Sequence, residues 1–168
     1  MIVNVTVENL APCKKLLRVE VDVKAVDGPI TISDNVVRGY RPCVSPLKGG
    51  TQDCSGSNGT GIVVHNGRAA GPAANVRVEG NDISDNVTGL VVSSGASHVT
   101  VSGNRIHDNG TGLLVDQVTD ISITANVFMN NTLQVRIESV SSGCTLSGNE
   151  LVPAQAIQLR QTVCPVGP

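Results

Sequence analysis

The sequence predicts an all-β fold, a parallel β-solenoid in which the chain winds through about six stacked rungs of 22–23 residues. Three observations predict it: a landmark that recurs at fixed spacing, short apolar strands at the same place in every repeat, and no stretch left over for a helix. The landmark recurs in steps of 23, 22 and 23 residues, at Gly80-Asn81, Gly103-Asn104, Ala125-Asn126 and Gly148-Asn149. Self-similarity with a period of about 20–50 residues is typical of stacked repeat folds.

Each repeat contains two strands and a short apolar segment between them. Before the landmark, apolar residues alternate with polar ones, at Val76 and Val78, Val99 and Val101, Ile121 and Ile123, and Cys144 and Leu146. Two residues after it stands one large apolar side chain: Ile83, Ile106, Phe128 or Leu151. A turn rich in Asn, Asp and Gly leads to the last strand, with Leu90 and Val92, Leu113 and Val115, and Val135 and Ile137. Such a repeat fits one triangular rung, and rungs stack about 4.8 Å apart.

The first two rungs follow the same pattern. Residues 2–10 resemble the first-strand segment at 75–83, so the solenoid is expected to begin almost at once. Residues 16–26 supply the last strand of the first rung. The second rung opens at residues 30–32 and is interrupted after Val37.

An inserted loop is predicted at residues 39–56. This stretch contains Pro, Gly, two cysteines and the only tyrosine, and it breaks every periodicity. The rung resumes at 58–64, where NGTGIVV matches NGTGLLV at 109–115, and a smaller bulge follows at 67–74. Four regular rungs then run to a frayed tail at 161–168. We therefore expect one solenoid domain over residues 1–168.

The repeated asparagine is expected to hold one corner of the stack together. Asparagine tolerates left-handed backbone angles, and its side-chain amide can bond to the amide of the next rung. Extending the frame backwards adds two asparagines, which gives the column Asn9, Asn35, Asn81, Asn104, Asn126 and Asn149. We interpret this column as a structural ladder rather than a ligand site.

The pattern V-x-V-x-G-N-x-I-x-D-N-x-T-G-L-x-V, clearest at 99–115, resembles the right-handed parallel β-helix superfamily of pectate lyases and related sugar-processing and carbohydrate-binding proteins. The resemblance covers nearly the whole chain and implies a single right-handed parallel β-helix. It implies no single activity, because the superfamily contains lyases, hydrolases, epimerases, viral tailspikes and non-catalytic modules. Its members usually cover the first rung with an amphipathic helix and block the last with a cap, and neither is found in this sequence.

Composition narrows the classes of function. A net charge of −2 gives no support for binding to nucleic acid or to an anionic membrane. Aromatic residues make up 1% of the chain, so stacking platforms for sugars or bases are not expected. No apolar run approaches the length of a membrane span, and no signal peptide is visible. No cofactor is expected, apart from a possible Ca²⁺ ion.

Five cysteines favour an oxidising compartment, so we expect an extracellular or cell-surface protein. Cys43 and Cys54 bracket the inserted loop and could close it, and Cys13 competes for either. Cys144 stands at an inward position, as a small buried hydrophobe or as a partner for Cys164. An odd count leaves one thiol free or shared with another chain.

The two uncapped ends predict association with further chain. An open rung exposes unpaired backbone groups, which are a template for another strand. We expect a homo-oligomer, an end-to-end assembly or a piece of a larger protein. A disulfide between Cys13 of one subunit and Cys164 of the next would make the end-to-end link covalent.

Two outer faces could also take part in binding. The middle residue of the last strand points outward, and this column is aliphatic at Val63, Val91 and Leu114 before it reaches Arg136. The inserted loop could cover the column, a second subunit could pack on it, or it could be an exposed patch. Outward Thr and Ser on the first strand resemble the ice-binding ladders of some antifreeze solenoids, although Arg77 and Glu79 interrupt them.

The best candidates for catalysis are Asp82, Asp85, Arg105, His107 and Asp108, with His98 nearby in sequence. Asp85 and Asp108 occupy the same corner in adjacent rungs, so they could hold Ca²⁺ or divide acid and base roles as in glycosidases. His107 could transfer protons, and Arg105 could bind the carboxylate of a uronate. The competing interpretation is turn chemistry, because one rung later the position reads Asn130-Asn131, without an acid.

The sequence therefore favours an extracytoplasmic structural or adhesive module that self-associates or presents a surface to a polysaccharide. The competing class is a polysaccharide lyase, glycoside hydrolase or epimerase with its site at the Asp82 to Asp108 cluster. An ice-binding solenoid is a minor alternative. No motif matches a particular catalytic set, so no catalytic residue is assigned.

Overall fold

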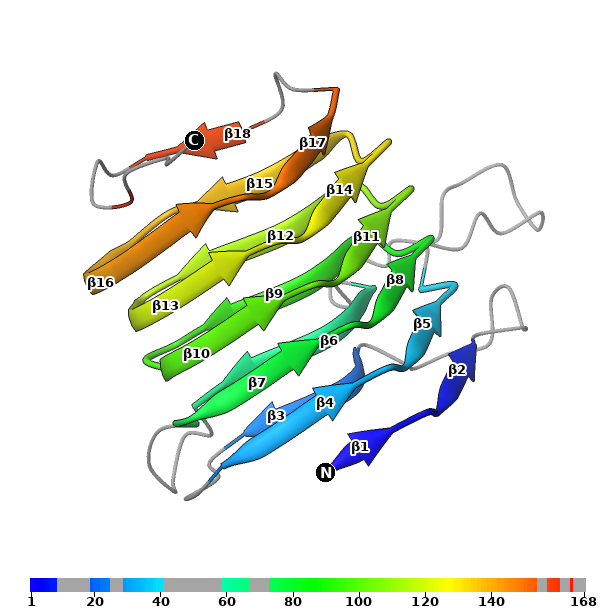
Figure 1. Cartoon of the computed structure of the whole chain (residues 1–168), viewed down its shortest axis with the longest axis horizontal. Helices are drawn as coiled ribbons and strands as arrows, with labels where there is room; N and C mark the ends of the chain where they lie inside the picture. The colour runs from blue at the N-terminus through cyan, green and yellow to red at the C-terminus, as the bar shows by residue number, and fades with distance from the viewer. Residues whose placement is uncertain are drawn as a thin grey trace, which may run out of the picture.

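The computed structural model describes residues 1–8, 19–24, 29–40, 59–66, 73–153, 157–160 and 164. These residues form 18 strands and no helix, and neighbouring strands in every sheet run parallel. Three consecutive strands make one rung, and the rungs stack from the N-terminal to the C-terminal end of the chain (Figure 1). The predicted fold class, an all-β parallel β-helix of about six rungs, is confirmed.

Each of the three six-stranded sheets takes one strand from every rung. The first sheet contains β1 (Ile2–Val3), β4 (Ile30–Ser33), β7 (Val76–Glu79), β10 (Ser97–Ser102), β13 (Val118–Thr124) and β16 (Val140–Ser147). The second contains β2 (Thr6–Glu8), β5 (Val36–Arg38), β8 (Asp82–Ser84), β11 (Arg105–His107), β14 (Val127–Met129) and β17 (Glu150–Val152). The third contains β3 (Val19–Lys24), β6 (Thr60–His65), β9 (Thr88–Ser93), β12 (Thr111–Asp116), β15 (Leu133–Ile137) and β18 (Ile157–Leu159).

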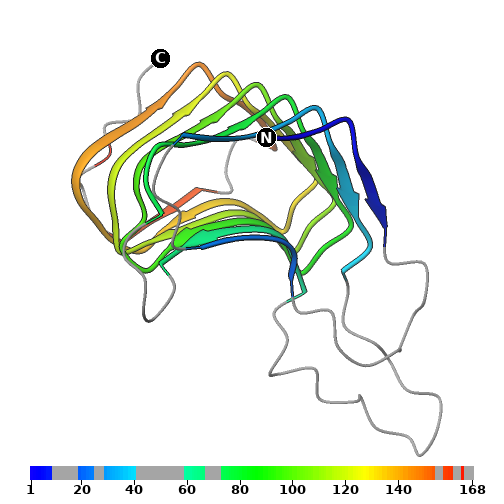
Figure 2. The ribbon, with the colours of Figure 1, turned by 90° about the horizontal axis from the view of Figure 1, so that it is seen from below.

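Seen from below, the rungs follow one another as similar outlines, each displaced from the one before (Figure 2). The first and third sheets face each other across the core, and the second sheet closes one side between them. The short strands of the second sheet are the single apolar segments that the sequence places after each landmark. The corner between the second and third sheets is described in the third, fourth and fifth rungs, and the candidate site lies there.

Inward side chains fill the space between the sheets. The predicted inward positions of the first and third sheets are at most 9% exposed from the third rung to the fifth, and so are Cys144 and Leu146 in the sixth. In the second sheet Ile83, Ile106 and Phe128 are fully buried, whereas Leu151 in the last rung is half-buried. Each fully buried aliphatic side chain contributes about 1.5–3 kcal/mol. The core is therefore a column made mainly of Val, Ile and Leu, and Phe128 is the one aromatic side chain in the described core cluster.

An asparagine ladder connects the rungs between the first and second sheets, formed by Asn35, Asn81, Asn104, Asn126 and Asn149. The Nδ2 group of each donates to Oδ1 of the next asparagine at 2.9 Å. That same Oδ1 also accepts the backbone N–H of the preceding asparagine, at 2.9–3.0 Å. The first four residues are at most 1% exposed. The ladder therefore replaces water for buried donors that would otherwise be unsatisfied.

The predicted register of the first rung, which aligned Asn9 with Asn35, is wrong. Asn9 itself lies outside the described residues, but β2 pairs with β5 so that Thr6 stands opposite Val36. Val5 therefore faces Asn35, and its backbone N–H donates to Asn35 Oδ1 at 3.0 Å. The sequence alternates polar and apolar residues throughout this segment, and alternation cannot distinguish registers that differ by an even number of residues.

Cys144 of β16 and Cys164 form a disulfide, one of the two possibilities left open for Cys144. Their Cα atoms lie 4.8 Å apart, within the range for such a bond. The expected covalent link from Cys13 of one subunit to Cys164 of the next is wrong, because the Cys164 sulfur is already bonded within the chain. Cys13, Cys43 and Cys54 lie outside the described residues.

Several other expectations fall largely outside the described part of the chain. Of the inserted loop predicted at 39–56, only Gly39 and Tyr40 are described, and of the bulge at 67–74 only the last two residues are. Of the predicted tail at 161–168, only Cys164 is described. The rung on either side of the insertion behaves as predicted, since β6 resumes in register with β9.

Candidate functional site

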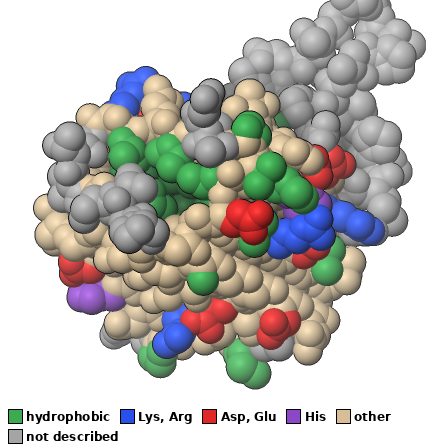
Figure 3. Space-filling model, turned by 45° about the horizontal axis from the view of Figure 1, so that its top comes forward, with side chains coloured by type: hydrophobic (Ala, Val, Ile, Leu, Met, Phe, Trp, Pro, Cys, Tyr) green, Lys and Arg blue, Asp and Glu red, His purple; other side chains and the backbone are tan. Residues whose placement is uncertain are grey.

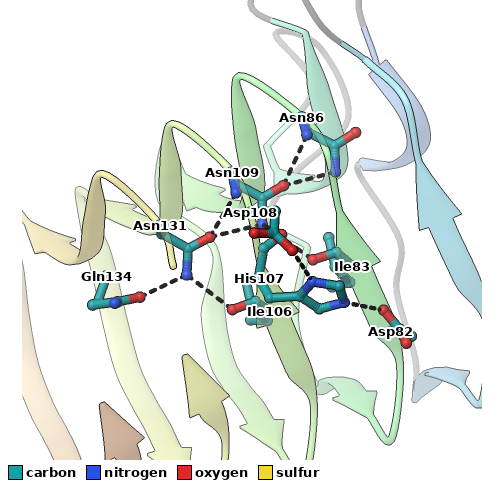
Figure 4. A network of polar contacts seen from close by, with 9 residues as sticks. All are labelled: Asp82, Ile83, Asn86, Ile106, His107, Asp108, Asn109, Asn131 and Gln134. Carbon is teal, nitrogen blue, oxygen red and sulfur yellow. Dashed lines mark hydrogen bonds and ion pairs between the residues drawn. The ribbon is translucent and has the colours of Figure 1, made fainter. Parts of the chain in front are cut away.

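The second sheet brings three of the predicted site residues into one hydrogen-bonded cluster, Asp82, His107 and Asp108 (Figure 4). Asp82 begins β8 and His107 ends β11, and the two strands are neighbours. His107 Nε2 lies 2.9 Å from Asp82 Oδ1, and His107 Nδ1 lies 2.6 Å from Asp108 Oδ2. The imidazole therefore bridges carboxylates from two adjacent rungs.

The ring of His107 is better protected than the two acids that hold it. Its side chain is 16% exposed, against 40% for Asp82 and 47% for Asp108. Ionised carboxylates only accept hydrogen bonds, so an imidazolium satisfies both contacts whereas a neutral imidazole can donate only one. Ion pairs this exposed contribute at most about 1 kcal/mol each. Their main effect is to fix where the carboxylates point.

Asp85 stands one rung away from Asp108, as predicted, because Ser84 pairs with His107. The two aspartates have φ angles of 66° and 55°, and Asn130 at the same corner has 56°. Asp and Asn are the residues that best tolerate this left-handed conformation, which supports the turn interpretation. Arg105 is in register with Asp82 and exposed, and its uronate-binding role stays a prediction.

His98 does not join the cluster. It lies on β10 of the first sheet, where its Nε2 is 3.4 Å from Asp120 Oδ2. Both residues line a second shallow groove, of about 290 Å³, which also includes Ser122 and Thr145. His98 is near the cluster in sequence, but it lies on a different face because the chain turns a corner between His98 and His107.

A second buried asparagine ladder, which the sequence analysis missed, lies directly behind the cluster (Figure 4). Asn86 Nδ2 donates to Asn109 Oδ1 at 3.0 Å, and Asn109 Nδ2 donates to Asn131 Oδ1 at 2.9 Å. Asn131 Nδ2 donates to Gln134 Oε1 at 2.6 Å. All four residues are at most 4% exposed. The signal was present in the sequence, since these asparagines repeat with the same steps of 23 and 22 residues.

Glycines make the space that this second ladder occupies. Gly61, Gly89 and Gly112 are buried and stand in register in the third sheet. A Cβ atom on Gly89 would lie 3.1 Å from Asn109 Nδ2 and 2.8 Å from the Gly112 carbonyl oxygen. This explains the Thr-Gly step of the repeat: the glycine column and the asparagine column are complementary parts of one corner.

A shallow groove of about 410 Å³ lies over this corner, beside the cluster. Its lining comes from three successive rungs, from Asn86 through Asp108 and Gly110 to Asn130 and Thr132. The groove therefore follows the axis of the stack. The amide of Asn86 is engaged in the ladder, whereas Asp108, Asn130 and Thr132 are exposed to solvent.

The outward columns of the first and third sheets have the predicted registers. Val63, Val91, Leu114 and Arg136 are stacked in the third sheet, and all four are half-buried rather than fully exposed. In the first sheet, Arg77 interrupts one hydroxyl column and Glu79 the other, and Arg77 Nε donates to Glu79 Oε1 at 2.7 Å. This outer face is broad and mostly uncharged, and apolar side chains gather at the C-terminal end of the stack (Figure 3). Neither finding tests the expected subunit contact or ice binding.

Within the described ranges, no group of three or more His, Cys, Asp and Glu side chains could hold a metal ion. A Ca²⁺ site at Asp85 and Asp108 stays a prediction that rests on two carboxylates from adjacent rungs. Of the residues that the structure describes, none lies in a helix long and apolar enough to cross a membrane.

Three parallel sheets built from stacked rungs, with asparagine ladders at two corners, define the class of protein as a parallel β-helix. The family described as a right-handed β-helix region matches residues 20–162, and the chain belongs to this family. The right-handedness that the resemblance implied is thereby confirmed. No curated protein matches the chain, and no solved structure does.

Proposed function

We propose that this chain is an extracytoplasmic β-helix module that binds an extended polysaccharide along its surface without cleaving it. The groove over the corner between the second and third sheets carries the proposal. It is open, its lining comes from three rungs with exposed polar side chains on two of them, and it follows the axis of the stack. An extended polymer can therefore meet the same corner on successive rungs, about 4.8 Å apart.

The chemistry of the lining favours a neutral, hydroxyl-rich glycan. The Asp108 carboxylate accepts hydrogen bonds from sugar hydroxyls, and the side chains of Asn130 and Thr132 can both donate and accept. Asp108 contributes negative charge to the groove, and the whole chain has a net charge of −2, so a polyanion would be repelled. Binding through hydroxyls alone is expected to be weak per site and to gain from a polymer that spans several rungs.

The geometry of the cluster supports binding over hydrolysis. Both nitrogens of His107 contact carboxylates, and both Asp82 and Asp108 contact that same ring. Acid–base catalysis needs a group within hydrogen-bond reach of the reacting atom, and glycosidases place two carboxyl groups on either side of the scissile bond. Here the two carboxyl groups lie on either side of an imidazole.

The Cys144–Cys164 disulfide supports the extracytoplasmic part of the proposal, because disulfides persist mainly in oxidising compartments.

Affinity electrophoresis through gels containing neutral polysaccharides tests the proposal. We expect at least one neutral glycan to retard the wild-type chain. Uronate-rich glycans should leave its mobility unchanged. Asp108→Asn and Thr132→Ala should each reduce the retardation several-fold. Asparagine is the substitute at position 108 because it tolerates the left-handed backbone there while it removes the charge. Thr145→Ala, on the first sheet, is the matched control and should migrate as the wild type does. Equal mobility in all gels would refute binding.

The cluster itself favours one second candidate, a polysaccharide-active enzyme that uses Asp82, His107 and Asp108. The supporting observation is the bridged arrangement of acid, imidazole and acid. Release of reducing ends or unsaturated products from uronate-rich glycans by the wild-type chain, abolished in His107→Ala, would establish this alternative in place of simple binding. The absence of products from such glycans in both chains would remove it.

A further inference from the structure

The outer face of the third sheet carries an aliphatic centre between charged ends. Its first outward column runs, one residue per rung, Asp22, Val63, Val91, Leu114, Arg136 and Gln158. Three aliphatic side chains therefore separate an acid in the first rung from a base in the fifth. The central residues are half-buried, so each leaves part of its apolar surface in solvent.

A second outward column lies beside the first on the same strands. It runs Lys24, His65, Ser93, Asp116, Glu138 and Arg160. Lys24 and His65 in rungs one and two thus precede an uncharged serine in rung three, and two acids follow in rungs four and five. In both columns the third rung is the uncharged midpoint.

We propose that the third sheet packs face to face on the third sheet of a second copy of this chain, about a two-fold axis that runs along the strands through Val91 and Ser93. Such an axis makes the two stacks antiparallel and keeps each column opposite itself. Rung one then faces rung five of the partner, rung two faces rung four, and rung three faces itself.

Every facing position is complementary in this arrangement. Asp22 faces Arg136, and Lys24 faces Glu138. In rungs two and four, His65 faces Asp116, and Val63 faces Leu114 in the apolar centre. Because the interface is two-fold symmetric, each pair occurs twice.

The same face does not fit when the copies are shifted. Moving the axis by half a rung toward the C-terminal end puts Arg136 opposite Val63 and Lys24 opposite Arg160. Moving it the other way puts Asp22 opposite Leu114 and leaves Arg136 without a facing residue. Charge complementarity therefore selects one register, as it does in interfaces where charges fix the alignment.

Within one chain the charged groups already pair, either along one strand or between adjacent strands. Lys24 Nζ lies 2.8 Å from Asp22 Oδ2, His65 Nε2 lies 2.9 Å from Asp22 Oδ1, and Arg136 pairs with Glu138. Burial raises the pKa of Asp22, but hydrogen bonds from Lys24 and His65 and their charges outweigh it, so its pKa lies below the ordinary value. A second copy would turn these pairs into networks without leaving any charge unpaired.

The overlap is just large enough for a specific contact. The third-sheet strands of the five overlapping rungs have 5 or 6 residues and are about 17–20 Å long, and five rungs span about 24 Å. The flat overlap is therefore roughly 500 Å² per copy and about 1,000 Å² in total, the lower limit for a specific interface. We expect a dimer that dissociates in the micromolar range.

Sedimentation velocity on two charge variants, alone and mixed, tests the proposal. In Asp22→Arg the two facing pairs become Arg with Arg, and in Arg136→Asp they become Asp with Asp. Each variant alone should dimerise at least tenfold more weakly than the wild type, because like charges face each other twice. Mixed in equal amounts, they should form a heterodimer of twice 17.3 kDa, since both facing pairs are again opposite in sign.

The mixture also controls for folding, because a variant that fails to fold cannot restore association. Arg77→Glu on the first sheet is the matched charge reversal and should dimerise as the wild type does. A wild-type chain that stays monomeric at concentrations well above the micromolar range would overturn the proposal. That result would do so whether the third sheet is covered by the inserted loop or exposed to solvent. Dimerisation of the wild type, without recovery in a mixture of two variants that both keep the wild-type circular dichroism spectrum, would overturn the proposed register.

Discussion

Removing one amide from the middle of the first asparagine ladder should destabilise the whole stack. Asn104 is 1% exposed, and its side chain makes five hydrogen bonds. Its Nδ2 donates to Asn126 Oδ1 and to the carbonyls of Val78 and Ser102, at 2.8–3.1 Å. Its Oδ1 accepts the backbone N–H and the Nδ2 of Asn81, each at 2.9 Å.

The cost of Asn104→Ala follows from what these partners lose. The backbone N–H of Asn81 is left buried without an acceptor, which costs about 1–3 kcal/mol. The other bonds contribute about 0.5–1.5 kcal/mol each, but several of their partners keep another contact. We therefore expect the free energy of unfolding to fall by about 3–5 kcal/mol, measured by urea denaturation with an unchanged m-value.

Asn149→Ala is the matched control at the last described position of the same ladder. Asn149 also bonds to Asn126 and to two carbonyls, but it is half-buried, so water can replace the lost amide. We expect a loss of about 1 kcal/mol or less. Equal losses for Asn104→Ala and Asn149→Ala would refute the reasoning, because the difference between them measures burial of the ladder.

Three further predictions concern other parts of the stack. Gly89→Ala should cost about 1–3 kcal/mol in thermal or urea unfolding, because its Cβ meets the second ladder and a backbone carbonyl, and a cost near zero would mean that the corner is loosely packed. Asp22→Asn should lower the free energy of unfolding at neutral pH. The difference from the wild type should disappear as the pH falls below the ordinary aspartate pKa of 3.8 and through the depressed pKa of Asp22. A difference that grows in acid would contradict this sign. Reduction of the Cys144–Cys164 disulfide, which closes a loop with a sequence separation of 20, should cost about 3 kcal/mol, and Ellman titration before and after reduction should count two additional thiols.

The architecture could be predicted because the constraints that make it are periodic. Alternation with period two assigns inward and outward side chains, and a repeat of 22–23 residues leaves room for one rung. The prediction failed at Asn9 for the same reason, since alternation alone does not distinguish registers that differ by an even number of residues. The inward positions of the regular rungs needed no information beyond this pattern.

The second asparagine ladder was missed because Asp-Asn and Asn-Asn pairs also have an ordinary explanation as turn residues. Both explanations hold in the structure: Asp85, Asp108 and Asn130 adopt left-handed turns, and the asparagines that follow them are buried. Burial depends on the glycine column of a strand that follows in sequence, and only the folded rung brings the two together.

The candidate site was predicted as a group of residues but not as a set of contacts. The sequence indicated that Asp82, His107 and Asp108 share one region. That the imidazole bridges both carboxylates depends on side-chain rotamers at a corner. The pairing of Cys144 with Cys164 likewise depends on where the chain returns after the last described strand.

The most direct test of the stacked architecture is a map of nuclear Overhauser contacts on the isotope-labelled chain. The account predicts contacts between residues 22–23 positions apart, including the side-chain amide protons of Asn81 with Asn104 and of Asn104 with Asn126. Cross-strand contacts between adjacent strands in sequence, as in antiparallel hairpins, or asparagine amides without mutual contacts would contradict it.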